Sequence, residues 1–378
     1  MSAVTASALP PFLVGALAVQ VRAELGFDAA GLGVVVGAYW ASSALCSAAL
    51  GRAAERLGAR RALRLGLTLN VVIQLTLAVA ARSWGALVAV LLAGGAVNAL
   101  VQLAVNVLLA HEVPPHRLGL ALGAKQSAVP LGTLLAGLAV PAVALTVGWR
   151  WAFVGGAVLG VGALLALPGG GPVRGHGAGG RARIGDRPLG PLVVLAVAGA
   201  LGAAAAGALA AFLVSGGVHA GIGEGAAGLL LTLGSACGIA VRLVAGARAD
   251  RRGGQPLRVV AVMLAGGAVA FLAYATGIAG AYALATPLAF GAGWAWPGLF
   301  NLAVVRDNPD RPGAATGVTQ TGIYVGALLG PLAFGAVVDH AGFGVAWVAT
   351  AGCSVAAATV MVVGRRLLVR RSADAAVR

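Results

Sequence analysis

The chain has 378 residues, of which 60% are hydrophobic and only 10% are charged. A soluble domain carries roughly 25% charged residues, so this chain has too little polar surface for a water-soluble globule. Because a transmembrane helix needs about 20 apolar residues, the length fits about twelve membrane spans and leaves no room for a soluble catalytic domain. The net charge of +15 would suggest nucleic-acid binding in a soluble chain, but in a membrane protein it is first a signal of topology.

Successive apolar runs along the chain predict an all-α membrane protein without strands. The first run begins almost at Met1, so we expect the natural start to lie upstream of it. The predicted helices are 3–21, 31–50, 63–81, 85–110, 118–146, 151–167, 190–214, 225–245, 257–278, 281–304, 314–338 and 344–364.

The basic residues divide unequally between the two sides of these helices. Twenty-one arginines fall in the connections after the even-numbered helices and in the C-terminal tail, against three (Arg22, Arg82 and Arg150) on the opposite side. Under the positive-inside rule, both termini are cytoplasmic in a multi-pass protein of the cytoplasmic membrane. The positive charge is thus explained without a nucleic-acid partner.

A glycine- and arginine-rich stretch divides the chain in two. We predict an N-terminal six-helix bundle over 1–168, a cytoplasmic linker over 169–188, a C-terminal six-helix bundle over 189–364 and a cytoplasmic tail over 365–378. Cys46, Cys237 and Cys353 fall in different spans, so neither a disulfide nor a metal or other cofactor is expected.

The two predicted bundles repeat each other in sequence. Gly51, an acid, an arginine and Gly58 after the second helix match Gly246, Asp250, Arg251 and Gly253 after the eighth, at an offset of 195. The starts of the fifth and eleventh helices match at an offset of 194, as do Gly148-Trp149 and Gly342-Phe343. Parallel repeats of this kind are typical of transporters that work by alternating access, with a pathway between the halves.

These features resemble the major facilitator superfamily over essentially the whole chain. The resemblance rests on the twelve helices, the basic central connection, and the motif Gly-x-x-x-Asp-Arg-x-Gly-x-Arg-Arg after the second helix, with a degenerate copy after the eighth. Residues 123–132 and 148–153 are similar to the bacterial branch that includes cyanate-permease-like carriers. The resemblance implies a secondary transporter that acts as a monomer.

The repeated motif predicts a conformational latch on the arginine-rich side. An acid facing a helix N-terminus gains about 0.3–1 kcal/mol, and the contact breaks when two halves rock. The family normally has aspartate where this chain has Glu55, whereas Asp250 keeps the usual residue. The predicted latch residues are Gly51, Glu55, Arg56, Gly58, Arg60, Gly246, Asp250 and Arg251. The alternative is that the arginines only determine topology.

Polar residues inside spans are costly and therefore point to function. Asn98, Gln102 and Asn106 lie on one face of the fourth helix, where they either line the pathway or bond neighbouring helices. Lys125, the only lysine, lies inside the fifth helix and either binds an anionic solute or extends to the membrane surface. The predicted pathway residues are Asn98, Gln102, Lys125, Gln126, Thr319, Gln320, Tyr324 and Trp294.

The acids argue against export of cationic drugs. All eleven lie in connections or at helix ends, so none is predicted at the membrane midplane. We therefore predict a secondary carrier of a small polar or anionic solute, with or without a coupling ion. A proton-coupled efflux carrier of drugs or metabolites with the same fold is the alternative. A membrane sensor without transport, a membrane-embedded enzyme and a pump subunit are less favoured by the sequence.

Overall fold

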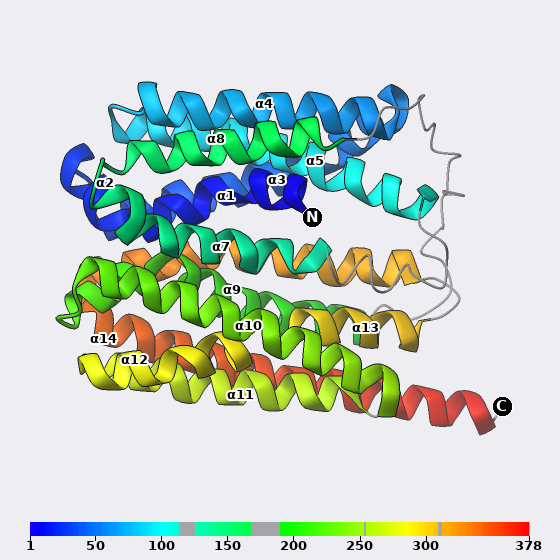
Figure 1. The fold of residues 1–378 in the computed structure, drawn as a ribbon. Helices are drawn as coiled ribbons and strands as arrows, with labels where there is room; N and C mark the ends of the chain where they lie inside the picture. The colour runs from blue at the N-terminus through cyan, green and yellow to red at the C-terminus, as the bar shows by residue number, and fades with distance from the viewer. Residues whose placement is uncertain (113–124, 168–189, 253–254, 309–311, 378) are drawn as a thin grey trace.

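The computed structural model describes residues 1–112, 125–167, 190–252, 255–308 and 312–377. Within these ranges the side chains of 48, 55, 110–112, 250–252, 312–314 and 369–377 lie outside the description. Every regular element among the described residues is a helix, as the composition predicts (Figure 1).

The first half of the chain forms helices that mostly follow the predicted runs. They are α1 (Ser2–Ala16), α2 (Ala18–Leu25), α3 (Ala29–Leu57), α4 (Ala59–Ala80), α5 (Trp84–Glu112), α7 (Ala128–Ala139), the π-helical turn η2 (Val140–Ala144) and α8 (Arg150–Leu165). The single helix predicted over 3–21 is wrong, because α1 and α2 meet at an angle of 70°. Beyond the break, α2 carries the polar side chains Gln20 and Glu24, which form hydrogen bonds with Glu224 and Trp149.

The second half repeats this arrangement. Its helices are α9 (Gly190–His219), α10 (Glu224–Arg252), α11 (Pro256–Ala275), α12 (Ala279–Leu288), the π-helical turn η3 (Ala289–Trp294), α13 (Pro297–Asp307) and α14 (Pro312–Val377). Gly342 has a non-helical conformation (φ 82°, ψ 170°), so two helical arms meet inside α14. The second arm continues through Val377 and makes the predicted tail helical. The predicted linker 169–188 lies outside the described residues.

The number of membrane spans is only partly tested by helix length. Among the described residues, eight helices are long and apolar enough to cross a membrane, or nine if α1 and α2 together make one span. The residues 128–144 and 150–165 form shorter apolar helices, and α14 is bent at Gly342. The total of twelve therefore stays a prediction.

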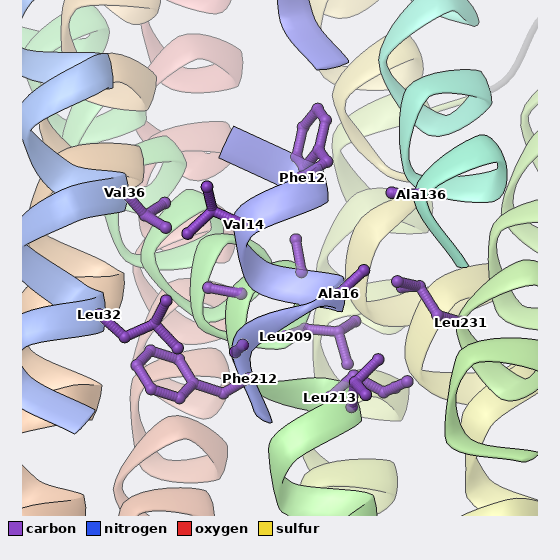
Figure 2. Packing of buried hydrophobic residues seen from close by; sticks show 14 of the residues in the cluster. Phe12, Val14, Ala16, Leu32, Val36, Ala136, Leu209, Phe212, Leu213 and Leu231 are labelled. Atoms are coloured by element: carbon purple, nitrogen blue, oxygen red, sulfur yellow. The ribbon is translucent and has the colours of Figure 1, made fainter. Parts of the chain in front are cut away.

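In Figure 1, α4 and α8 lie at one edge of the molecule, α11 and α12 at the opposite edge, and α7 and α9 between them. We refer to α1–α8 as the N-terminal half and to α9–α14 as the C-terminal half. Buried residues of both halves meet around α1 (Figure 2), where a Cβ added at Gly15 would lie 3.0 Å from the Cα of Ala211 in α9. The apolar core is thus shared between the halves.

Two helix pairs bring the halves into close contact. The first arm of α14 packs on α3, where a Cβ added at Gly33 would overlap the carbonyl oxygen of Pro331. Similarly, α7 packs on α10, where a Cβ added at Gly137 would lie 2.6 Å from the carbonyl oxygen of Gly228. Small residues allow such close approach of membrane helices. Gly33 and Gly228 differ by 195 positions, and Gly137 and Pro331 by 194, so the two contacts are equivalent in the repeat.

The turns repeat in the same way. Gly148 (φ 102°) and Gly342 (φ 82°), which the sequence pairs, both have positive φ. Gly26 (φ 67°) and Gly221 (φ 86°), again 195 residues apart, form a second such pair. Because residues with a side chain rarely adopt this conformation, glycine is needed at both copies of each turn. The backbone thus supports the internal duplication inferred from the sequence.

Candidate functional site

Asn98 of α5 lies in a buried network that joins three helices of the N-terminal half. Its Oδ1 accepts a hydrogen bond from Ser7 of α1 at 3.1 Å, and its Nδ2 donates to Ser43 of α3 at 3.1 Å. The hydroxyl of Tyr39 donates to the carbonyl of Ser7 in the same network. The structure therefore favours the interhelical alternative for Asn98, since its polar atoms are already bonded and only 3% of the residue is exposed.

Gln102, one turn further along α5, is half-buried, and no hydrogen bond of its side chain is found among the described residues. One more turn along, Asn106 accepts a hydrogen bond from the ammonium group of Lys125 at 2.7 Å. The amide side chains predicted on one face of α5 therefore have different roles at different depths in the membrane. Asn98 bonds helices together, whereas Asn106 holds the lysine.

Arg242 of α10 is the charged residue that the sequence reasoning passed over. It lies 18 positions after Glu224, about 27 Å along the helix at 1.5 Å per residue. Its Nη1 donates to the carbonyl of Gln126 in the N-terminal half at 3.2 Å, and its Nη2 donates to the carbonyl of Trp294 at 2.6 Å. One guanidinium group thus bridges the two halves.

The third nitrogen of the Arg242 guanidinium has no partner among the described residues. This nitrogen, Nε, is buried, and no described carboxylate forms an ion pair with the guanidinium, since Arg150–Glu24 is the ion pair found among described residues. A charge inside a span costs about 2.5–3.5 kcal/mol on insertion scales. The signal in the sequence is its position, because Arg242 lies six residues before Arg248, the first of the arginines that cluster in the last turns of α10.

Aromatic side chains surround the Arg242 bridge. The guanidinium carbon lies 5.9 Å from the ring centroid of Trp294, within the range of a cation–π contact. The ring of Phe12 lies 6.2 Å from both Trp40 and Trp294, and Phe290 lies 5.5 Å from Trp294. We call Phe12, Trp40, Phe290 and Trp294 the aromatic wall. It takes residues from both halves, and its two indoles are only half-buried.

The remaining predicted pathway residues differ from one another in burial and in hydrogen-bond partners. Thr319 is fully buried and bonds back to the carbonyls of Ala315 and Thr316 in its own helix. Gln320 has a buried Oε1 without a partner, as does Asn301 at its Oδ1. Tyr324 is half-buried. The structure brings Gln126 and Trp294 together through Arg242, but it does not bring Thr319 to the same bridge.

The predicted latch is described only in part. The side chains of Glu55, Asp250 and Arg251 lie outside the described residues. Gly58 alone connects α3 to α4 and has φ 82°, as a tight turn requires. An added Cβ would meet only an ordinary contact at Gly51 and open space at Gly246. Arg56 is exposed and Arg60 half-buried.

The opposite end of the helices, which we call the arginine-poor end, carries contacts between the halves. The carboxylate of Asp339 in α14 accepts hydrogen bonds from the backbone N–H groups of Ala29 at 3.1 Å and Ala30 at 2.5 Å, at the N-terminus of α3. Gln20 of α2 donates to Glu224 of α10 at 3.0 Å. An acid at a helix N-terminus is favourable, so these contacts hold this end closed.

Deeper in the bundle, hydroxyl groups continue the contact between α7 and α10. Thr133 and Ser235 share a hydrogen bond of 2.8 Å, and Thr232 donates to the carbonyl of Leu134 at 3.3 Å. Every hydrogen bond between the halves whose two partners are described lies between the arginine-poor end and Arg242. Arg242 is therefore the last of these bridges toward the arginine-rich end.

The described acids agree with the predicted distribution. Glu24, Asp28, Glu224 and Asp307 lie at helix ends, and Asp339 lies three residues before the bend at Gly342. Within the described part of the chain, no group of three or more His, Cys, Asp or Glu side chains is arranged to hold a metal ion.

These observations define a class. A chain of apolar helices in two repeated halves, with charged and polar side chains between the halves, has the architecture of a multi-pass membrane transporter. The sequence matches the family model of the Major Facilitator Superfamily over residues 1–331. The chain therefore belongs to the major facilitator superfamily, as its motifs suggested.

Solved structures of transporters share this fold. The nucleoside transporter NupG superposes with a TM-score of 0.71 at 17% sequence identity, over 96% of this chain and 98% of that chain. A D-xylose–proton symporter gives 0.73 at 16% identity, over 95% of each chain. A bacterial homologue of the human lysosomal transporter Spinster, in an inward-facing and unoccupied conformation, gives 0.68 at 14%, over 97% and 94%. No curated protein matches the sequence.

Proposed function

We propose that the protein is a secondary carrier that moves a small polar or anionic solute across the cytoplasmic membrane by alternating access. The observation that carries this proposal is the position of the contacts between the halves. The described hydrogen bonds between the halves include Gln20 with Glu224 and Asp339 with the N-terminus of α3, so the halves are joined at the arginine-poor end. Two rigid halves that contact at one end at a time provide alternating access.

The orientation follows from the same argument. Under the positive-inside rule the arginine-rich end faces the cytoplasm, with both termini there. The end at which Asp339 and Glu224 join the halves then faces the outside. The acid motif in the last turns of α3 and α10 would close the cytoplasmic end in one of the two conformations, which is the latch role that we propose for Glu55 and Asp250.

The cations favour an anionic or strongly polar solute. Arg242 donates a hydrogen bond to the carbonyl of Gln126, and Lys125 is the residue directly before Gln126. The described acids lie at helix ends, so no described carboxylate at mid-depth supports export of a cationic drug. Proton-coupled efflux of a metabolite with the same fold remains the alternative, and the symporter and nucleoside transporter with similar folds add sugars and nucleosides to the solutes worth testing.

Transport in proteoliposomes without nucleotide tests the proposal. The full chain is reconstituted, and uptake of radiolabelled benzoate, cyanate, uridine and xylose is compared with that of empty liposomes. A saturable uptake of at least one of these solutes, unchanged by ATP, is expected. A requirement for ATP would contradict a secondary carrier. Absence of uptake for every solute, with no solute-dependent movement of the halves, would contradict the carrier function itself.

A further inference from the structure

We propose that Arg242 and the aromatic wall form a binding site for a monovalent organic anion with a flat apolar body, such as an aromatic carboxylate. This inference rests on the proposed carrier function and names the chemical class of its solute.

No described carboxylate forms an ion pair with the charge at this site. The guanidinium of Arg242 donates to two neutral carbonyl oxygens, on Gln126 and Trp294, and keeps a buried Nε–H without an acceptor. A carboxylate is the ligand that matches such a donor, since charged hydrogen bonds to a guanidinium are about twice as strong as neutral ones. A single guanidinium carries one positive charge and therefore suits a single negative charge.

The surroundings of Arg242 determine the rest of the solute. Trp294 supplies both a carbonyl partner and a ring beneath the guanidinium, at 5.9 Å from the ring centroid. Phe12 lies between Trp294 and Trp40 at 6.2 Å from each. The two indoles remain half-buried, so part of each ring is left for contact. Flat apolar groups stack on such faces.

The internal repeat contains a second copy of this helix contact, and that copy has no charged residue at the equivalent position. At the offset of 195, Arg242 corresponds to Ser47 of α3, and Gln126 corresponds to Gln320 at the offset of 194. The equivalent pair therefore carries no charge, although the two helix pairs contact in the same way at Gly33 and Gly228. A charge needed only for packing would have no reason to differ between two copies of one contact.

The path to the site is also cationic. Lys125 directly precedes Gln126, and its ammonium group reaches Asn106 in the last two turns of α5. Its described partner, Asn106, is neutral. An anion that enters from the arginine-rich end would meet Lys125 near the site, which raises its local concentration.

Binding to the purified full-length protein tests the inference with three probes that differ in their charge or in their aromatic ring. Benzoate has both the charge and the ring, benzamide keeps the ring without the charge, and acetate keeps the charge without the ring. Isothermal titration is expected to give benzoate a Kd at least about tenfold below that of each other probe. Equal affinity for benzamide would overturn the anionic part, equal affinity for acetate would overturn the aromatic part, and no binding of benzoate would overturn both.

Variants then assign the preference to Arg242. Arg242→Gln is expected to remove the preference for benzoate over benzamide, and Arg242→Lys to keep part of it because the charge remains. Arg258→Gln, which removes an exposed arginine at the start of α11, is the matched control and is expected to keep the full preference. A preference that survives in Arg242→Gln would overturn the proposal. If Arg242→Gln does not fold, the Lys variant and the three probes on the natural protein decide the result.

The outcome is separable from that of the proposed function. If xylose or uridine is taken up by proteoliposomes and benzoate does not bind, the carrier function stands and the anion site is wrong. If benzoate binds with the expected preference and no solute is transported, the site stands and the carrier function is wrong.

Discussion

Asn98 illustrates how a polar residue within a span can be structural. Its amide takes part in two side-chain hydrogen bonds, to Ser7 and Ser43, and is buried between α1, α3 and α5. The sequence predicted its face on the helix correctly, but could not tell a cavity from a neighbouring helix. That distinction depends on Ser7 and Ser43, which are 91 and 55 residues away in the sequence.

Asn98→Ala is expected to lower the free energy of unfolding by about 1–2 kcal/mol, because it leaves two buried hydroxyl groups short of a partner. Thermal unfolding of the purified protein measures the effect. Gln102→Ala, one turn further along the same helix, is the control and should cost less than about 0.5 kcal/mol. Equal losses in the two variants would mean that the Asn98 network is not a special source of stability.

Lys125 was predicted from the sequence as a cation inside a span, and the structure adds its partner, Asn106. Lys125→Gln is expected to reduce uptake of an anionic solute such as benzoate by about tenfold or more, because the attraction of the entering anion is lost. Uptake of a neutral solute should change little. Initial rates in proteoliposomes check this, and unchanged benzoate uptake would make Lys125 an anchor at the membrane surface.

Arg242 could not be predicted in the same way. In the sequence it is one arginine among many near the end of a span, and only its contacts with Gln126 and Trp294 reveal that it bridges the halves. Gln126 is 116 positions from Arg242 in the sequence, and Trp294 is 52 positions from it. Periodicity within one helix carries no information about them.

At the scale of helices, the α3–α14 contact depends on the absence of a side chain at Gly33. Gly33→Ala is expected to shift the protein away from the conformation closed at the arginine-poor end, because the new Cβ would overlap the carbonyl of Pro331. Accessibility of introduced cysteines at that end to a membrane-impermeant thiol reagent measures the shift. Gly155→Ala is the control, since open space surrounds Gly155. No difference between the variants would contradict the role of this contact.

The cap that Asp339 forms on α3 is expected to stabilise the same conformation. Asp339→Asn removes a negative charge from the N-terminus of α3, a loss of about 0.3–1 kcal/mol, and should raise the population open at the arginine-poor end about two- to fivefold. The same labelling assay reports this change. Asp307→Asn, an acid at the C-terminal end of α13, serves as control, and an equal effect there would point to net charge instead of the cap.

Helices and their ends were predicted unequally well. The apolar runs gave most helices to within a few residues, but α3, α10 and the second arm of α14 extend further than their apolar parts. These extensions are rich in arginine. A hydropathy pattern predicts a connecting segment for such residues, although arginine is a good helix former. The break between α1 and α2 was missed for the opposite reason, because the hydrophobic pattern continues across it.

At the scale of the whole molecule, the internal repeat was the most informative property of the sequence. It predicted equivalent turns at Gly148 and Gly342, and both have positive φ. It also implies the pairing of Gly33 with Pro331 and of Gly228 with Gly137, which are equivalent contacts between the halves. The duplicated chain thus forms two equivalent helix contacts between the halves. Arg242 gives one of these contacts a charge where the other has Ser47, although the two helix pairs pack in the same way.

The central claim is that the two halves rock about these contacts, opening one end as the other closes. Spin labels at Leu57 and Val259 report on the arginine-rich end, and labels at Val147 and Ile278 report on the arginine-poor end; all four side chains are exposed. The natural cysteines Cys46, Cys237 and Cys353 are first replaced by serine, and a pair within one half, Leu57 and Val72, serves as control.

Distances between these labels, measured by double electron–electron resonance in liposomes with and without a transported solute, test the claim most directly. The account predicts two populations at each end, with the distance at one end increasing as the distance at the other decreases, and no change in the control pair. Distances that stay fixed at both ends, or that change in the same direction at both, would contradict it.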